Sequence, residues 1–410
     1  MNRDSSEFIE MNEPVPAISV ITIVKNNEEL LPRAVDSVLR QTLTDFEYII
    51  VNDGSIDGTG GIIEEYAAQD KRVLPLHISK NVGRAKARNT GMDAAKGQYI
   101  FFLDSDDYLP STALLDLYEV AEEDNADIVY GRIKSFDQAT GAWRPHYYTD
   151  KIISSERHGL RLDDHLDLVD NHQIVGRIFR HRFLKEREIR FSTQRQNAED
   201  VLFSFYSAFH AESLSMVPWK TIYFYSFGKQ LEAVNEIKLF DARDNLLETI
   251  DFALKHGSIS LKKRMLQKGV IFAGNLYRAQ KVYEGQEEKF LTYLTTLVPF
   301  VKDIGDDILA DLPLDYLNFS VEEIAHLSSY YRRFAKTLQS GDVKQAHTLW
   351  EQKQKKSAMI QKKEVNKQEV LKLRHANKKL VEELEHLYNS RSWRITAPLR
   401  QMKKLVARKR

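Results

Sequence analysis

Five short apolar runs in the first 130 residues constrain the fold more than any other feature. They are nearly continuous and rich in β-branched residues, as in parallel strands that are covered on both faces. Stretches with helical periodicity lie between them, and this alternation predicts an α/β domain with a mostly parallel sheet. The expected strands are Ile18–Val24, Tyr48–Val51, Val73–Ile78, Tyr99–Leu103 and Asp127–Tyr130, and the expected helices are Glu29–Gln41, Gly58–Asp70 and Gly83–Ala95.

Polar residues cluster directly after these strands. They occupy residues 25–28, 52–57, 79–83 and 104–107. The carboxyl ends of parallel strands meet along one edge of a sheet, and ligands bind beyond that edge. The sequence therefore predicts a binding site built from these four segments.

Composition limits the chemistry that this site can use. The chain has 410 residues and no cysteine. Disulfides, thiolate zinc sites and cysteine nucleophiles are excluded, so any metal must take oxygen or imidazole ligands. Basic and acidic residues both number 59, and this balance gives no reason to expect nucleic acid as a partner.

The pattern changes near residue 231. Candidate strands disappear, and amphipathic helical stretches follow at Leu239–Leu254, Leu261–Val282 and Glu322–Leu338. We therefore expect four parts in the chain. They are an N-terminal tail over residues 1–17, the α/β domain over 18–230, a helical domain over 231–350 and a C-terminal segment over 351–410.

The C-terminal segment begins with a heptad-like pattern over Val370–Leu387, which has Asn377 at one core position. An asparagine there can set a two-stranded parallel register, so the pattern favours a short coiled coil and a homodimer. The alternative is a single helix that packs on its own domain.

The last segment, Arg391–Arg410, carries eight basic residues and no acidic one, with apolar residues between them. Such a segment can lie on anionic lipid. The alternative is a solvated terminus that binds nothing.

The start of the chain, Met1–Pro16, lacks the basic and apolar stretches of a signal peptide. No stretch approaches the roughly 20 apolar residues that span a bilayer. We therefore expect a cytoplasmic protein that is peripheral on the inner face of the cell membrane.

The strand at Tyr99–Leu103 ends in Asp104-Ser105-Asp106, followed by a third carboxylate, Asp107. Asp104 and Asp106 are two residues apart, so both can point to the same side of an extended chain. Such a cluster is costly unless a cation neutralises it. Mg²⁺ and Mn²⁺ prefer carboxylate and phosphate oxygens. A turn-capping aspartate cluster is the structural alternative.

Four segments in order resemble the motifs of family 2 glycosyltransferases, which have a GT-A fold. They are the opening strand and loop, the strand ending in Asp-Gly-Ser, the Asn-x-Gly-x-x-x-Ala-Arg-Asn-x-Gly helix and the metal-binding strand. A weaker match runs through Asn197–Phe203 and Val217–Tyr225. The four segments are Ile18–Glu28, Tyr48–Asp57, Asn81–Gly91 and Gly97–Asp107.

The resemblance implies a UDP-sugar donor and a role for each matching residue. Asp53 would accept the uracil imide hydrogen, and the first loop would pack against the base. Asn81 and Arg88 would face the ribose-diphosphate region. In the Asp104-Ser105-Asp106 motif, Asp104 would touch the ribose and the metal, and Asp106 would ligate the metal, as Mn²⁺ or Mg²⁺. The residues of the first loop in this set are Ile23, Asn26 and Glu28.

The resemblance also implies that Glu199-Asp200 supplies the catalytic base. Neighbouring residues on a helix point about 100° apart, so only one of them can face the sugar. We expect Asp200 to be the base, with Glu199 as the second candidate. A helix-start acidic pair that complements the helix dipole is the structural alternative.

The chain departs from the family pattern at several positions. Ile23 and Lys25 stand where members usually have proline and an aromatic residue. Arg177 lies in a segment where lysine is frequent, and Ser226 stands where arginine is frequent after the late Tyr-x-Tyr. These departures fall at positions that stack on the base or contact the donor phosphates in the family pattern.

The resemblance implies direct, inverting transfer of a sugar to a hydroxyl of a cell-surface polysaccharide, teichoic acid or lipid-linked glycan. The segment Ser390–Arg400 resembles a tail found after coiled coils in bacterial polysaccharide glycosyltransferases. Two other functions stay open. One is a nucleotidyltransferase, and the other is a non-catalytic scaffold of the same fold in a membrane polysaccharide assembly complex.

Overall fold

The computed structural model describes residues 15–137, 140–227 and 236–276, and a few positions between 333 and 349. The chain divides into two compact units, Met1–Val343 and Lys344–Arg410. Every element below belongs to the first unit. The expected coiled coil at Val370–Leu387 and the tail Arg391–Arg410 lie outside the described residues, and both stay predictions.

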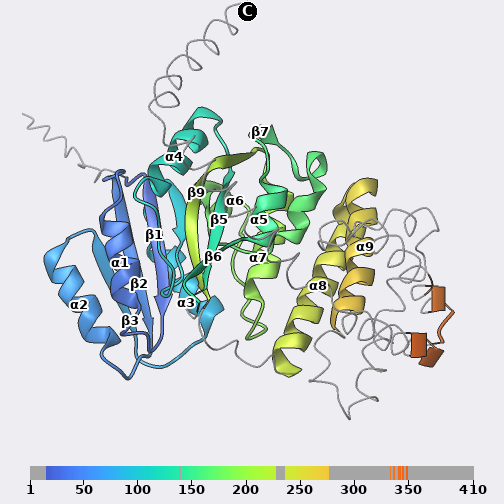
Figure 1. The fold of residues 1–410 in the computed structure, drawn as a ribbon, viewed down its shortest axis with the longest axis horizontal. Coiled ribbons are helices and arrows are strands. Elements are labelled where there is room, and N and C mark those ends of the chain that lie inside the picture. The colour runs from blue at the N-terminus through green and yellow to red at the C-terminus, as the bar shows by residue number, and fades with distance from the viewer. Residues whose placement is uncertain are drawn as a thin grey trace, which may run out of the picture. The chain divides into compact units, whose positions relative to one another are not determined.

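The expected alternation of strands and helices is present (Figure 1). All five expected strands and all three expected helices form. Their ends differ from the expected ones by a few residues, except that the fifth strand continues to Asp137. The elements are β1 (Ile18–Val24), α1 (Leu31–Leu39), β2 (Phe46–Asp53), α2 (Thr59–Gln69), β3 (Val73–Ile78), α3 (Arg84–Ala94), β4 (Tyr99–Phe102), α4 (Ala113–Glu123) and β5 (Ile128–Asp137).

The second half of the unit completes the sheet and adds helices at one end. Helix α8 covers the first expected amphipathic stretch, and α9 covers the second up to Leu276, where this range of described residues ends. The elements are β6 (Ala142–Pro145), α5 (Tyr147–Ile152), β7 (Arg157–Leu160), η1 (Leu162–Asp164), η2 (Leu166–Asp170), β8 (Arg177–Arg180), α6 (His181–Glu186), α7 (Glu199–His210), β9 (Leu214–Phe227), α8 (Glu236–His256) and α9 (Ile259–Leu276).

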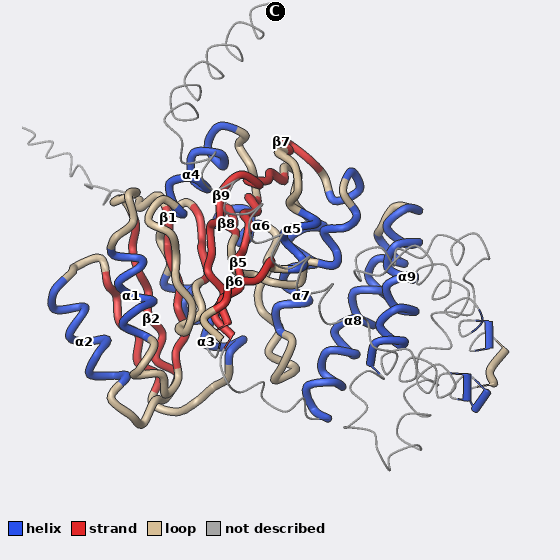
Figure 2. The backbone as a smooth tube through the Cα atoms, in the orientation of Figure 1, coloured by secondary structure: helices blue, strands red, loops and turns tan. Residues whose placement is uncertain are grey.

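The strands form one sheet in the order β3-β2-β1-β4-β8-β5-β9-β7, with β6 paired to β5 (Figure 2). Strands β3, β2, β1 and β4 are mutually parallel, as the continuous apolar runs predict, and β5 is parallel to β9. Strand β8 enters antiparallel between β4 and β5. The fold is therefore the expected α/β class, with antiparallel pairs in its second half.

The core lies around the parallel strands, because β2 and β4 are buried along their whole length. Helix α3 packs on β1 and β2. Gly91 permits this close approach, since a Cβ there would lie 2.6 Å from Cγ2 of Ile21. The packing places the start of α3 beside the carboxyl ends of β1 and β2.

Helices α8 and α9 pack on each other, and α8 also packs on α7. Phe252 of α8 makes edge-to-face contacts with Phe205, Tyr206 and Phe209 of α7. Among the described helices, none is both long and apolar enough to cross a membrane.

Candidate functional site

The loops after β1 and β2 are joined by hydrogen bonds at the carboxyl edge of the sheet. Asn26 has a left-handed backbone with φ 49°. Its amide N–H donates to Oγ of Ser55 at 3.0 Å, and its side-chain oxygen accepts from the amide of Ile56 at 2.9 Å. Glu28 accepts from the amide of Gly58 at 2.6 Å. Asn26 and Glu28 therefore shape the edge of the site by holding the two loops together.

Asn27, which the sequence patterns did not single out, joins the first loop to the Asp104-Ser105-Asp106 motif. Its side-chain amide donates to Oγ of Ser105 at 2.9 Å. Its backbone amide donates to Oγ1 of Thr59 at 3.0 Å. Ser105 thus links the loops after β4 and β1.

Asp53, at the end of β2, is buried, and its carboxylate holds the loop that precedes α3. One oxygen accepts from the amide of Val82 at 2.7 Å, and the other accepts from the amide of Gly83 at 3.1 Å. The side chain of Asn81 also accepts from the amide of Gly83, at 2.9 Å. Asp53 and Asn81 therefore lie together, as expected, and both organise the same loop.

Asp107 anchors the carboxylate motif to β9. It is almost fully buried, and it accepts hydrogen bonds from the Tyr223 hydroxyl at 2.6 Å and from the amide of Ser226 at 2.6 Å. The Tyr223 oxygen accepts from the amide of Asp104 at 3.1 Å. Burial, together with the charges of Asp104 and Asp106, raises the pKa of Asp107 well above its usual range. Asp107 is therefore a structural anchor.

Arg33 of α1 braces the same motif from the other side. Its guanidinium donates to the carbonyl oxygen of Asp106 at 2.5 Å and to Oγ of Ser226 at 3.0 Å. It also lies 4.7 Å from the ring centroid of Tyr108. A cation thus reaches Ser226, where arginine is frequent in the family pattern, from a different element. Periodicity gave no signal for Arg33, because it sits in an ordinary amphipathic helix.

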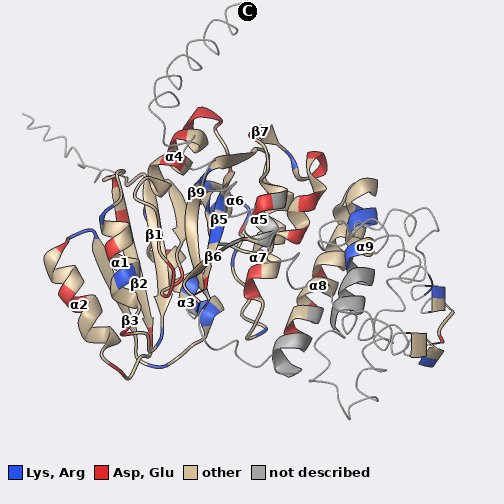
Figure 3. Ribbon diagram, in the orientation of Figure 1, with Lys and Arg blue, Asp and Glu red and all other residues tan. Residues whose placement is uncertain are grey.

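Arg88 connects the carboxylate motif to α7. Its side chain is 3% exposed, and its two terminal nitrogens donate to Glu199 and, at 3.1 Å, to Asp104. Nε of Arg84 lies 3.0 Å from the same Glu199 oxygen. Glu199 is buried between two guanidiniums, so its negative charge is neutralised. In Figure 3 the basic residues of α3 are coloured blue beside the sheet.

Asp200 differs sharply from its neighbour Glu199. It is partly exposed, and its carboxylate makes no hydrogen bond or ion pair with another residue in the part of the chain that the structure describes. Burial and the charge of Glu199 raise the pKa of the Asp200 carboxyl to about 6. The structure therefore brings both expected base candidates to the site and gives them different surroundings.

The surroundings of the carboxylate motif carry an excess of acidic side chains. The carboxylates of Asp104, Asp106 and Asp200 face the guanidiniums of Arg84 and Arg88, and the acidic groups of the region outnumber the basic ones. Burial and the charge of Asp104 raise the pKa of Asp106, which is the effect expected where negative charge lacks a cation. Within the described ranges, no three acidic or histidine side chains form a complete ligand set. A divalent cation here would need further ligands, such as phosphate oxygens.

The structure also places three positions that depart from the family pattern. Ile23 is half-buried in β1 and packs against the core, and Lys25 is exposed just beyond the strand. Arg177 is fully buried beneath the ring of Tyr130, 4.5 Å from its centroid, and donates to the carbonyl of Asn171 at 3.5 Å. The Arg177 side chain therefore packs in the buried interior beside the sheet.

Comparison with known proteins shows the family of this chain. The family model described as glycosyl transferase family 2 matches residues 19–187. The poly(ribitol-phosphate) beta-N-acetylglucosaminyltransferase TarP of Staphylococcus aureus is 31% identical over 238 residues, which cover 56% of this chain and 68% of TarP. The chain belongs to glycosyl transferase family 2.

Another relative matches a shorter part of this family 2 chain. The uncharacterized glycosyltransferase EpsJ of Bacillus subtilis is 46% identical over 115 residues, which cover 28% of this chain and 33% of EpsJ. The match thus spans about a third of the length of that relative.

A solved structure shares the fold. TarS 1–349 of S. aureus in complex with UDP-GlcNAc has a TM-score of 0.65 at 20% identity, covering 82% of this chain and 91% of TarS 1–349. This likeness confirms the expected GT-A-type α/β fold of the family 2 chain.

Proposed function

We propose that this chain transfers a sugar from a UDP-sugar to a hydroxyl group of a cell-surface polysaccharide, teichoic acid or lipid-linked glycan. The observation that carries the proposal is the environment of Asp200. A partly exposed carboxylate with a pKa of about 6 lies one residue from the ion-pair network that reaches Asp104. The pKa of an effective general base lies near the working pH, and Asp200 meets this condition.

The proposed reaction is a direct displacement with inversion. The acceptor hydroxyl oxygen forms a bond to the anomeric carbon, the bond from that carbon to the UDP oxygen breaks, and the hydroxyl proton moves to Asp200. Glu199 is less available as the base, because Arg84 and Arg88 both bind its carboxylate oxygen.

The donor half of the proposal rests on the carboxyl edge of the sheet. Asp53, Asn81 and the first loop line the place where the resemblance puts uridine, and Ile23, Asn26 and Glu28 belong to that loop. Asp104 and Asp106 would hold Mn²⁺ or Mg²⁺, which would stabilise the negative charge of the departing UDP. Arg88 would orient Asp104 while this charge develops.

The relatives narrow the donor and the acceptor that should be tested first. TarP is named as a poly(ribitol-phosphate) beta-N-acetylglucosaminyltransferase, and TarS was crystallised with UDP-GlcNAc. A protein of Bacillus spizizenii with 32% identity over 48% of this chain is named as a poly(ribitol-phosphate) beta-glucosyltransferase. We therefore propose UDP-linked glucose and N-acetylglucosamine as the first donors and polyol-phosphate polymers as the first acceptors.

The test is a transfer assay with each UDP-sugar, with and without Mn²⁺ and candidate acceptors. Asp200→Asn should lower transfer by about 10²–10⁴-fold while UDP binding stays unchanged. Asp251→Asn is the matched control, because Asp251 is exposed on α8 and forms an ion pair with Lys255 one turn along the same helix. Full transfer by Asp200→Asn would disprove the base assignment. UDP binding without transfer by the unmodified protein would favour the scaffold function.

A further inference from the structure

The segment before Asp200 has a conformation that needs outside support. Ala198, two residues before Asp200, has a left-handed backbone with φ 54° and ψ 32°. This region is unfavourable for a residue that has a Cβ atom. No side chain caps the first turn of α7, so contacts from elsewhere must hold the start of this helix.

Asn245 of α8 supplies two of these contacts. It is 1% exposed. Its side-chain amide donates to the carbonyl of Asn197 at 3.2 Å and to the carbonyl of Ala198 at 2.8 Å. One buried side chain thus binds both carbonyl groups that precede α7.

Asp241, one helical turn earlier on α8, binds the same segment as a hydrogen-bond acceptor. One of its oxygens accepts from the backbone amide of Asn197 at 3.0 Å and from its side-chain amide at 2.8 Å. Asp241 and Asn245 are four residues apart, so they lie on the same face of the helix. Together they hold both the amide and the carbonyl of Asn197.

Arg195 closes the network. Its guanidinium donates to the side-chain oxygen of Asn245 at 2.7 Å and to Glu248 at 2.8 Å. Both ends of the Asn245 amide are therefore engaged, and its orientation is determined. Three successive turns of α8 face residues 195–198.

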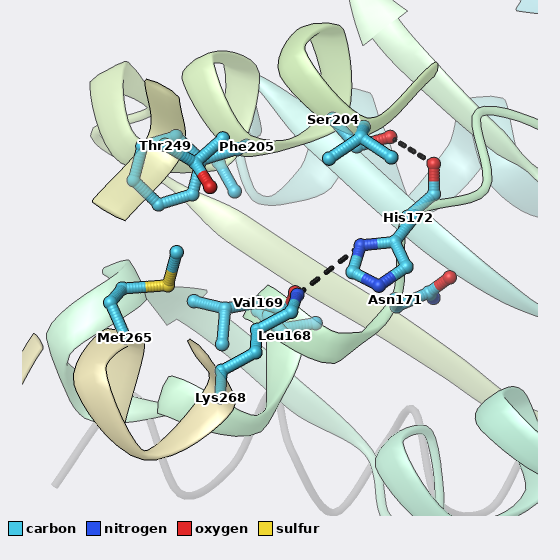
Figure 4. Close-up of a pocket in the computed structure, with 11 residues that line it drawn as sticks. Leu168, Val169, Asn171, His172, Ser204, Phe205, Thr249, Met265 and Lys268 are labelled. Carbon is cyan, nitrogen blue, oxygen red and sulfur yellow. Dashed lines mark hydrogen bonds between the residues drawn. The ribbon is translucent and has the colours of Figure 1, made fainter. Parts of the chain in front are cut away.

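Helices α7 and α8 also pack against each other through aromatic side chains. Phe252 lies against the aromatic side chains of α7. A cavity of about 10 Å³, room for about one water molecule, is bordered by η2 and the helices α7, α8 and α9. Figure 4 shows Lys268 reaching across this cavity to His172. This packing holds α8 in place, so α8 can position residues 195–198.

We propose that Asn245 and Asp241 are positioning residues for Asp200. Helix α8 is then part of the structure that holds the catalytic base in place. The inference rests on the proposed function, because it assigns the geometry of the same base. The family model ends at residue 187, before α7 and α8. Glu199 is tied to Arg88 on the sheet side, and Asn197 is tied to α8 on the other. Asp200 is thus aligned by two independent attachments.

The main test uses Asn245→Asp, which keeps the shape of the side chain and removes its donor to both carbonyls. We expect kcat for transfer to fall about 10–100-fold, since small misplacements of a catalytic group cost about this much. The KM for the UDP-sugar and the affinity for UDP should stay unchanged. Hydrogen exchange at the amides of residues 196–200 should become faster.

Asp241→Asn is the second variant, because it keeps an acceptor oxygen and is milder if Asn245→Asp folds poorly. Asp251→Asn, on an exposed face of the same helix, should match the unmodified protein in every measurement. Unchanged kcat in both Asn245→Asp and Asp241→Asn would overturn the inference, and so would a parallel loss of UDP binding. Failure of the proposed function looks different, because then the unmodified protein itself transfers no sugar.

Discussion

Two neighbouring carboxylates at the start of α7 differ in burial and in their direct partners. Glu199 is buried between Arg84 and Arg88, whereas Asp200 is partly exposed and carries a raised pKa. Helical geometry explains the difference, because consecutive side chains point about 100° apart. A single turn of helix can therefore supply one structural anion and one reactive carboxylate.

The pH dependence of transfer should report Asp200. Its pKa is raised to about 6 by burial and by the charge of Glu199. A base must be unprotonated to act, so kcat/KM should be constant above pH 7 and fall as pH decreases through 6, approaching tenfold per unit. The measurement is a pH–rate profile with UDP binding followed at each pH. A rate that stays constant down to pH 4.5 would rule out a base with this pKa.

The buried ion pair of Arg88 should matter more to stability than an exposed pair. Arg88→Ala would leave Glu199 and Asp104 without their shared partner, and loss of one member of a buried pair costs about 3–5 kcal/mol. Arg190, which pairs with Asp93 on the surface, is the matched control. Arg190→Ala should cost about 0–1 kcal/mol. Urea unfolding measures both, and equal losses would contradict the ranking.

At the scale of elements, the turn after β2 depends on Gly54. Its φ is +70°, and a Cβ there would lie 2.6 Å from the backbone nitrogen of Asn81. Gly54→Ala should push the loop before α3 away and break the bonds from Asp53 to Val82 and Gly83. We expect weaker UDP binding by calorimetry.

Gly61 in α2 provides the control for this substitution. No atom lies within 4 Å of the Cβ that Gly61→Ala would add. Alanine favours a helix interior over glycine by about 1 kcal/mol, so this variant should be as stable as the original or more stable. Unaltered UDP affinity in Gly54→Ala would show that the turn does not shape the donor site.

The strands differ in how well the sequence predicts them. Strands β1, β2 and β3 are continuous apolar runs, and their positions follow from the pattern. The positions of β8 and of the long β9 do not follow from the pattern. Strand β9 contains Pro218, and its pairing with β5 shifts register near Arg132. Irregular, half-buried strands lack a clear period. Their place in the sheet is determined by partners far away in the chain.

At the scale of the whole molecule, the tail Arg391–Arg410 stays a prediction. Each basic residue near an anionic surface contributes about 1 kcal/mol, so the full chain should sediment with vesicles that contain phosphatidylserine. Removing residues 391–410 should abolish this binding and leave transfer to a soluble acceptor unchanged. Vesicles of neutral lipid are the control. Full-length protein that never sediments with anionic vesicles would refute membrane contact through the tail.

Local sequence patterns were enough to predict the α/β class, the edge of the sheet where we propose the donor site and the residues that gather there. Local periodicity and motif spacing carry this information, because strands and loops form from neighbouring residues. Only the tertiary structure distinguished Asp200 from Glu199, and it also revealed the bracing by Arg33 and Asn245. Arg88 and Glu199 are 111 residues apart in sequence. The charge state of a carboxylate depends on such distant partners and on burial, which no local pattern specifies.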